Sequence, residues 1–257
     1  MDIRSVTSEQ FREDLEGAVN SVIQKIRGDG LSDWNEDYIT RELLYEYRQR
    51  FRKIEIKSGK KVIQITSEAY KLSGRLKAEP RFGDIALIVR IRYSDKIVEG
   101  VAFLEAKKKQ EGGNNFDAIK RKQLETIYEH APHALLLLYD YENIANDQDY
   151  KLQKPYGIRS SRSIHAVTLP INLALNFDIK NTTLYRFSSP LSYQVLGRYF
   201  RGLDLEFSKE AVKIAKGYMR DLGLPKFLVV ISAVVSSDGH GEAPSRIEYN
   251  TDIFGEL

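Results

Sequence analysis

The feature that most constrains this chain is a long apolar hairpin with charged residues at one end. Two strongly apolar runs flank a polar turn at residues 94–96, and most of their consecutive positions are hydrophobic. Such runs are typical of strands that are covered on both faces of a sheet. Asp84 begins the first run, and Glu105 and Lys107 end the second. A fold that buries this hairpin must therefore also accommodate three charges at its end.

The spacing of these charges predicts that they share one face. Side chains alternate along a strand, so Glu105 and Lys107 point to the same side. If the turn is centred on residues 95–96, Asp84 falls opposite Lys107 and lies on that side too. A turn one residue longer would move Asp84 to the other face. The predicted cluster therefore depends on the register of the hairpin.

Two carboxylates in apolar surroundings repel each other and lose hydration, so they need cations. Lys107 supplies one charge, and a divalent metal would supply the rest. Asp84, Glu105 and the carbonyl oxygen of Ala106 are hard ligands that suit Mg²⁺ or Mn²⁺. Such a metal polarises a phosphodiester and lowers the pKa of bound water, while Lys107 would orient the water and stabilise developing charge. The residues predict a phosphodiester hydrolase that needs no Cys, Ser or His nucleophile.

The remaining periodicities predict an α/β protein with a mixed sheet flanked by helices. Helices are expected at 9–27, 35–53, 116–130, 190–199 and 208–222, a second hairpin at 53–69, and further strands at 133–141, 163–176 and 226–236. We expect an N-terminal helix in 1–32, a core in 33–170 and a C-terminal α/β accessory region in 171–257, packed on the core or extending it.

Composition narrows the classes of function. A chain of 257 residues with 42% hydrophobic content can bury one sizeable core. Its lack of cysteine excludes disulfides and thiolate metal sites and fits a cytoplasmic location. No apolar run reaches membrane-spanning length, so we expect no membrane partner. Basic zones at 41–61 and 151–201 fit either a polyanionic partner or solvated faces.

The hairpin motif resembles the PD-(D/E)xK nuclease superfamily, which has the restriction-endonuclease-like fold. Gly-Asp-Ile-Ala-Leu at 83–87 and Ala-Phe-Leu-Glu-Ala-Lys-Lys at 102–108 carry the resemblance. It implies that Asp84, Glu105 and Lys107 are catalytic and that Mg²⁺ (or Mn²⁺) is the cofactor. The sequence departs from the family name at one position: Gly83 precedes the aspartate, and the nearest proline is Pro80.

Two flanking helices extend the resemblance. Members often carry a glutamate on the preceding helix, for which Glu36 is preferred over Glu42, and a glutamine on the following helix, here Gln123. A first-turn helix acid and an exposed helix glutamine are the competing interpretations of Glu36 and Gln123. The residues expected to contact nucleic acid are Lys108, Lys109, Lys120, Arg121, Lys122 and Tyr128.

The resemblance implies a metal-dependent endonuclease, with DNA as the expected substrate, acting in restriction, antiphage defence or repair. Such an effector must be restrained in its own cell, so we expect a regulatory protein partner or a homo-oligomer. Two other hypotheses remain at this stage. One is a non-catalytic nucleic-acid-binding or adaptor subunit on the same fold. The other is a structural protein in which the acid–lysine cluster is a buried ion pair.

Overall fold

The computed structural model describes residues 3–58, 61–73, 81–117, 119–151, 163–219, 223–236 and 245–257. The first half contains β1 (Arg4–Thr7), α1 (Ser8–Gly28), α2 (Glu36–Phe51), β2 (Lys53–Ser58), β3 (Lys61–Leu72), β4 (Ile85–Arg92), β5 (Ile97–Lys108), α3 (Arg121–His130) and β6 (Leu135–Tyr139). The second half contains η1 (Ile144–Asn146), α4 (Gln148–Lys151), β7 (Ala166–Pro170), α5 (Ile171–Phe177), η2 (Thr182–Phe187), β8 (Ser189–Pro190), α6 (Leu191–Tyr193), η3 (Gln194–Arg198), η4 (Tyr199–Arg201), α7 (Lys209–Ala215), β9 (Phe227–Ser236) and β10 (Phe254–Glu256).

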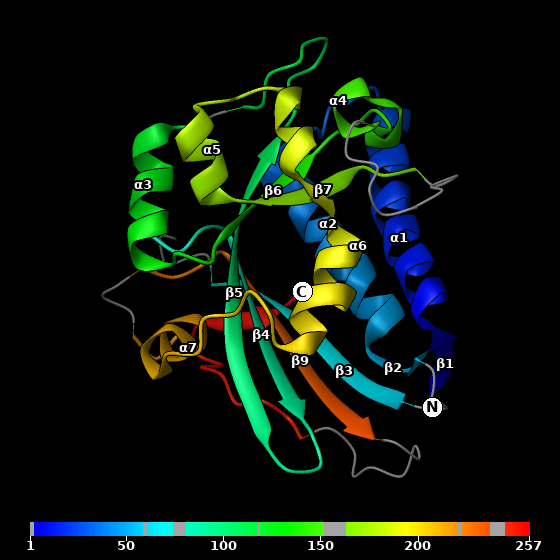
Figure 1. Ribbon diagram of the computed structural model, residues 1–257, viewed down its shortest axis with the longest axis vertical. Helices are drawn as coiled ribbons and strands as arrows, with labels where there is room; N and C mark the ends of the chain where they lie inside the picture. The colour runs from blue at the N-terminus through cyan, green and yellow to red at the C-terminus, as the bar shows by residue number, and fades with distance from the viewer. Residues whose placement is uncertain are drawn as a thin grey trace.

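A single ten-stranded mixed sheet organises the described part of the chain. Its order is β1-β2-β3-β9-β4-β5-β6-β7-β8, and β10 pairs with β3. The late strand β9 lies between β3 and β4, antiparallel to the first and parallel to the second (Figure 1). The sheet is therefore continuous between the expected core at 33–170 and the region at 171–257, because a strand from the latter completes its centre.

Helices cover both faces of this sheet, which confirms the predicted α/β class. One face packs against α1, α2 and the α6–η3–η4 segment, and the other against α3, α5 and α7 (Figure 1). No helix in the described ranges is long and apolar enough to cross a bilayer.

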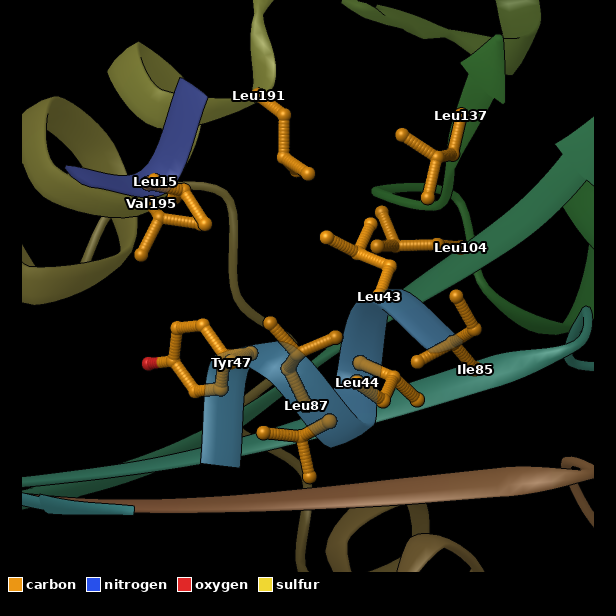
Figure 2. A pocket seen from close by; sticks show the side chains of 11 residues that line it. Leu15, Leu43, Leu44, Tyr47, Ile85, Leu87, Leu104, Leu137, Leu191 and Val195 are labelled. Atoms are coloured by element: carbon orange, nitrogen blue, oxygen red, sulfur yellow. The ribbon is translucent and has the colours of Figure 1, made fainter. Parts of the chain in front are cut away.

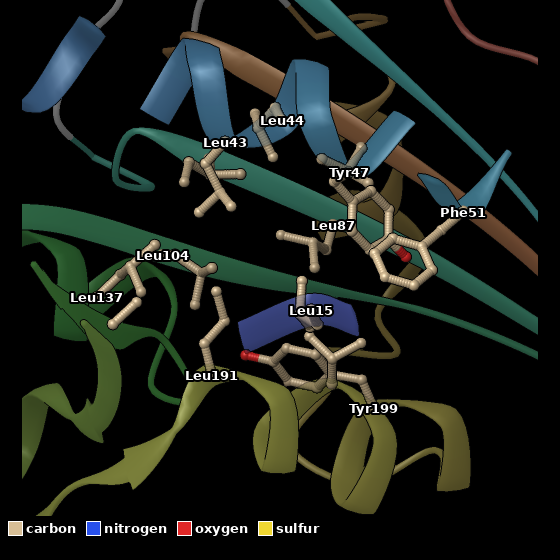
Figure 3. Packing of buried hydrophobic residues seen from close by; sticks show 14 of the residues in the cluster. Leu15, Leu43, Leu44, Tyr47, Phe51, Leu87, Leu104, Leu137, Leu191 and Tyr199 are labelled. Carbon is tan, nitrogen blue, oxygen red and sulfur yellow. The ribbon is translucent and has the colours of Figure 1, made fainter. Parts of the chain in front are cut away.

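The core on the α1–α2 face is built from leucines and aromatic rings. Leu15, Leu87 and Tyr199 meet there from a helix, a strand and η4 (Figure 3). A cavity of about 40 Å³ remains between these layers, and leucine, isoleucine, valine and one tyrosine line it (Figure 2). Because no charged residue lines this cavity, it belongs to the core and not to the chemistry of the charged cluster.

The central hairpin has a different register from the predicted one. Ile85 pairs with Leu104, Arg92 pairs with Ile97, and the Tyr93 N–H donates to Lys96 at 2.8 Å, so the turn is centred on residues 94–95 and not on the expected 95–96. The ladder is shifted by two positions from the predicted register, and Glu105 and Lys107 keep their common side of β5. Asp84 lies just outside the ladder: its N–H donates to Leu104 at 2.8 Å, and its side chain accepts from the Ala106 N–H at 3.1 Å. The three charges therefore meet at the ends of the strands, with Asp84 reaching the cluster from outside the ladder.

Most predicted elements occur, but several differ in extent or type. The strand predicted at 163–176 ends at Pro170, and Ile171–Phe177 forms the helix α5 instead. The helix predicted at 116–130 begins only at Arg121, because Phe116 instead pairs with Lys109 in a β-bridge. The helix predicted at 190–199 is divided among α6, the π-helical η3 and η4. The one predicted at 208–222 ends at Ala215, just before Gly217 with its positive φ of 79°. Pro80 and the turn at residues 59–60 lie outside the described residues.

Gly83 places Asp84 at the start of β4. Its φ is +80°, a conformation that costs L-residues with a side chain about 1–2 kcal/mol. A Cβ at this position would lie 2.6 Å from the carbonyl oxygen of Leu104, on the neighbouring strand. The glycine immediately before the aspartate is therefore required both by backbone conformation and by the close approach of β5.

We expect Gly83→Ala to lower the free energy of unfolding by about 3 kcal/mol, from backbone strain and overpacking together. Gly112→Ala is the matched control, because Gly112 also has a positive φ, +66°, but nothing lies within 4 Å of its added Cβ. Equilibrium urea denaturation should show a clearly smaller loss for the control. Equal losses in the two variants would contradict a steric requirement at Gly83.

Candidate active site

Sheet topology brings four charged positions to one edge. Asp84 precedes β4 and Lys226 precedes β9, and these strands are parallel neighbours, so their starts lie side by side. The antiparallel strand β5 ends at the same edge and carries Glu105 and Lys107. Backbone bonds fix the arrangement, since the Asp84 N–H donates to Leu104 (2.8 Å) and the Phe227 N–H donates to Asp84 (3.0 Å).

Glu105 is the most enclosed carboxylate of the site. Its Oε1 accepts hydrogen bonds from the Lys107 ammonium at 2.5 Å and from the Gln123 amide at 2.7 Å. Glu105 is 1% exposed and Lys107 is 3% exposed. Gln123 reaches Glu105 from the first turn of α3, which packs on this face of the sheet. The structure thus places Gln123 in the charged cluster rather than pointing into solvent.

Asp84 contacts both the backbone and a second lysine. Its Oδ2 accepts from the Ala106 N–H at 3.1 Å, and its Oδ1 lies 3.3 Å from the Lys226 ammonium. The N–H and C=O of one strand residue point toward the same neighbouring strand. We therefore infer that the Ala106 carbonyl also faces the Asp84 side of β5.

Glu36, and not Glu42, joins this cluster. Asn35 caps α2 through the Tyr38 N–H, which sets Glu36 in the first helical turn. One Glu36 oxygen lies 3.6 Å from the Lys107 ammonium, and the other accepts from the Lys108 N–H at 3.4 Å. Glu42 instead pairs with lysine and arginine on the helical surface, namely Lys25 at 3.0 Å and Arg41 at 3.1 Å.

The electrostatics of the cluster reflect an excess of negative charge. Burial, reinforced by the charge of Asp84, raises the pKa of Glu105 to about 8, although Lys107 opposes the shift. Burial also raises the pKa of Glu36. Burial alone would lower the pKa of Lys107, but Glu105 and then Glu36 outweigh it, so the net direction is upward. The cluster therefore favours additional positive charge, as a proton or as a cation.

The donor set fits a hard divalent cation that retains water ligands. Asp84, Glu105 and the Ala106 carbonyl supply oxygen donors at the sheet edge. Burial and then the charge of Asp84 raise the pKa of Glu105, so a cation beside it would stabilise its charged form. In the described ranges, no three His, Cys, Asp or Glu side chains are grouped so that together they could hold a metal ion. Mg²⁺ and Mn²⁺ tolerate such a sparse set because water and substrate phosphate complete their coordination.

The residues expected to bind nucleic acid fall into different environments. Lys120, Lys122 and Tyr128 are exposed on or next to α3. Arg121 is also exposed and pairs with Glu125 at 2.9 Å. The Lys108 ammonium binds Asp117 at 2.7 Å.

Lys109 has a structural environment instead. Its side chain is buried, lies 3.1 Å from Asp140 and also contacts Glu142. Asp140 accepts a further hydrogen bond from the Tyr185 hydroxyl at 2.6 Å, and the Lys109 carbonyl accepts from Trp34 at 2.7 Å. In this structure the ammonium of Lys109 is enclosed within the fold and cannot reach a nucleic-acid backbone.

Lys226 was not identified from the sequence. Besides Asp84, it pairs with Asp37 on α2 at 2.9 Å. In the sequence, Lys226 is recognisable only as a lysine directly before a buried strand. Many lysines with no functional role occupy such positions. Its role depends on β9 inserting beside β4, and that pairing joins segments separated by more than a hundred residues.

Comparison with known proteins yielded no relatives. No protein-family model, curated protein or solved structure matches this chain.

We expect Asp84→Asn to lower the pKa of Glu105 from about 8 toward the ordinary glutamate range, because the charge of Asp84 is the second largest cause of the shift after burial. A pH titration followed by carboxyl ¹³C NMR measures this change. Asp117→Asn is the control, since Asp117 pairs with Lys108 outside the Glu105 contacts. A Glu105 titration that is the same in both variants would show that the two carboxylates are not coupled.

Proposed function

We propose that this protein is a divalent-metal-dependent nuclease that hydrolyses phosphodiester bonds, with DNA as its substrate. The observation that carries the proposal is the convergence of Asp84, Glu105 and Lys107 at one sheet edge, with Gln123 and Glu36 in contact with them. A buried ion pair with a purely structural role requires only Glu105 and Lys107. The additional carboxylates and the raised pKa of Glu105 support a site that binds a cation.

Asp84, Glu105 and the Ala106 carbonyl would hold Mg²⁺ or Mn²⁺. When bound, the metal would supply Lewis-acid chemistry, lowering the pKa of a water and neutralising phosphate charge. The protein itself contributes a fixed frame: Gly83 and the backbone bonds of Asp84 and Phe227 set the aspartate. Gln123 holds the Glu105 carboxylate by donating a hydrogen bond to Oε1 from α3.

Lys107 would act on the attacking water and the transition state. Its ammonium is held between Glu105 and Glu36, so its position is defined before substrate binds. From there it can orient a water for attack on phosphorus and stabilise the charge that develops on the phosphorane oxygens. As water attacks phosphorus, one of its protons passes to solvent, the P–O bond to the leaving deoxyribose oxygen breaks, and that oxygen takes up a proton from solvent.

The substrate would approach across the exposed part of α3. Lys120 and Lys122 are exposed in the segment that also carries Gln123, and they make no ion pair with any described residue. Ammonium groups at such positions bind phosphates without reading sequence. The exposed Tyr128 offers a ring for contact with sugar or base.

The finer fold and biological role are also part of this proposal. The resemblance of the hairpin motif supports a restriction-endonuclease-like core and a cytoplasmic role in restriction or antiphage defence. A nuclease of this kind would be restrained by a regulatory protein or by self-association. These assignments rest on analogy with the PD-(D/E)xK superfamily.

The direct test is cleavage of supercoiled plasmid and linear DNA with Mg²⁺ or Mn²⁺. We expect Lys107→Ala to reduce the rate by at least about 100-fold, the loss typical of removing one transition-state donor. Lys213→Ala is the control, because Lys213 is an exposed lysine on α7 outside this site. EDTA should abolish cleavage by every variant.

Two outcomes would contradict the proposal. One is cleavage by Lys107→Ala as fast as by the wild type, which would assign the chemistry to another part of the chain. Alternatively, a wild type that binds DNA but does not cleave it, and that Mn²⁺ does not stabilise against heat, would favour a non-catalytic nucleic-acid-binding subunit.

The affinity for Mn²⁺ should rise with pH. Because the pKa of Glu105 is raised to about 8, protons compete with the metal for its carboxylate at and below that pH. The apparent dissociation constant should therefore fall up to about tenfold per pH unit between pH 6 and 8 and then level off. The same proton stabilises the metal-free fold, and this contribution declines as pH rises from 4.5 toward 8. Isothermal titration calorimetry in two buffers measures both affinity and proton release; a constant affinity would contradict the prediction.

A further inference from the structure

Lys226 lies where the charged cluster meets solvent. Its side chain is 41% exposed, compared with 16% for Asp84 and 4% for Lys107. A metal ion or a phosphate that approaches Asp84 from solvent therefore meets the Lys226 ammonium at the same carboxylate. The two lysines of the cluster differ in kind, since Lys107 is enclosed between Glu105 and Glu36 while Lys226 has open space beside it.

The backbone of Lys226 is fixed on both sides. Its carbonyl accepts from the Leu72 N–H at 2.8 Å, and the next residue, Phe227, donates to Asp84 at 3.0 Å. Any movement of the ammonium must therefore come from the side chain alone. Four methylene groups give that side chain the freedom to swing without disturbing the sheet.

Lys226 and a divalent metal would compete for the same carboxylate. One oxygen of Asp84 accepts from the Ala106 N–H, and the other faces Lys226 at 3.3 Å. A divalent ion bound to Asp84 would stand within a few ångströms of the ammonium and repel it. Asp37, on the exposed rim at 2.9 Å, offers Lys226 a second anion that it keeps after leaving Asp84.

We propose that Lys226 is a displaceable counter-ion that occupies Asp84 in the metal-free protein and is expelled toward Asp37 when a divalent cation binds. This inference rests on the proposed metal site and adds its regulation. In the metal-free state, Lys226 offsets the repulsion among Asp84, Glu105 and Glu36. In the metal-bound state the cation offsets this repulsion instead. The Lys226 ammonium then lies beside Asp37 on the exposed rim, where it can contact a substrate phosphate.

Competition of this kind is reciprocal. Suppose that Lys226 stabilises the metal-free folded state and not the metal-bound state. Its removal then lowers the folding equilibrium constant of the metal-free protein, and the dissociation constant for the metal must fall by the same factor. A lysine that merely decorated the rim would change neither quantity. A lysine that helped to hold the metal site together would weaken metal binding when removed.

The experiment measures Mn²⁺ binding to the full chain from the electron paramagnetic resonance signal of free Mn²⁺. We expect Lys226→Gln to lower the dissociation constant about tenfold, within the usual range for coupled sites. Lys226→Arg keeps the charge and should stay close to the wild type. Lys213→Gln removes an equal charge from exposed α7 and should leave the affinity unchanged.

Urea unfolding gives the second readout. In EDTA, Lys226→Gln should unfold at lower urea than the wild type, and saturating Mn²⁺ should close that gap. Unchanged or weaker Mn²⁺ binding by Lys226→Gln, with binding by the wild type still lost in Asp84→Asn, would overturn the counter-ion role while leaving the metal site intact. A wild type that binds no Mn²⁺ would overturn the proposed metal site and this inference together.

Discussion

The buried pair of Glu105 and Lys107 is the constraint on which the rest of the site depends. A charge in an apolar interior is costly unless an opposite charge and hydrogen bonds compensate for it. Here the two side chains lie 2.5 Å apart, and Gln123 and Glu36 provide the further contacts. Two helices, on opposite faces of the sheet, thus reach the end of β5. The charged pair is therefore contacted from both helical layers, by Gln123 on α3 and by Glu36 on α2.

Compensation within the cluster is incomplete. Asp84, Glu105 and Glu36 face only two lysines, and burial together with the charge of Asp84 raises the pKa of Glu105 to about 8. A protein selected for stability alone could replace such a group with apolar side chains at little cost. Sites that are destabilised in the empty state and relieved by a ligand are typical of functional centres. This imbalance is the physical argument for a cation-binding role.

The two lysines divide the task of neutralisation. Lys107 is enclosed and fixed, which suits a group that must be in place when chemistry occurs. Lys226 is half exposed and held by two anions, which suits a group that exchanges. The fixed lysine comes from the hairpin, while the exchangeable one comes from β9, a strand near the far end of the chain. The site is thus assembled from both halves of the sequence.

The sequence by itself determined the hairpin, the shared side of Glu105 and Lys107, α1, α2 and the buried strand at 226–236. These features depend on the alternation of side chains along a strand and on the spacing of apolar residues along a helix. Both are local properties, and the two-residue shift in the pairing of β4 with β5 does not change them. Tertiary structure alone decided that β9 separates β3 from β4, that Lys226 meets Asp84, and that Lys109 is enclosed beside Asp140. The physical reason is that strand pairing between distant segments leaves no periodic signal in either segment, whereas it determines which side chains share a neighbourhood.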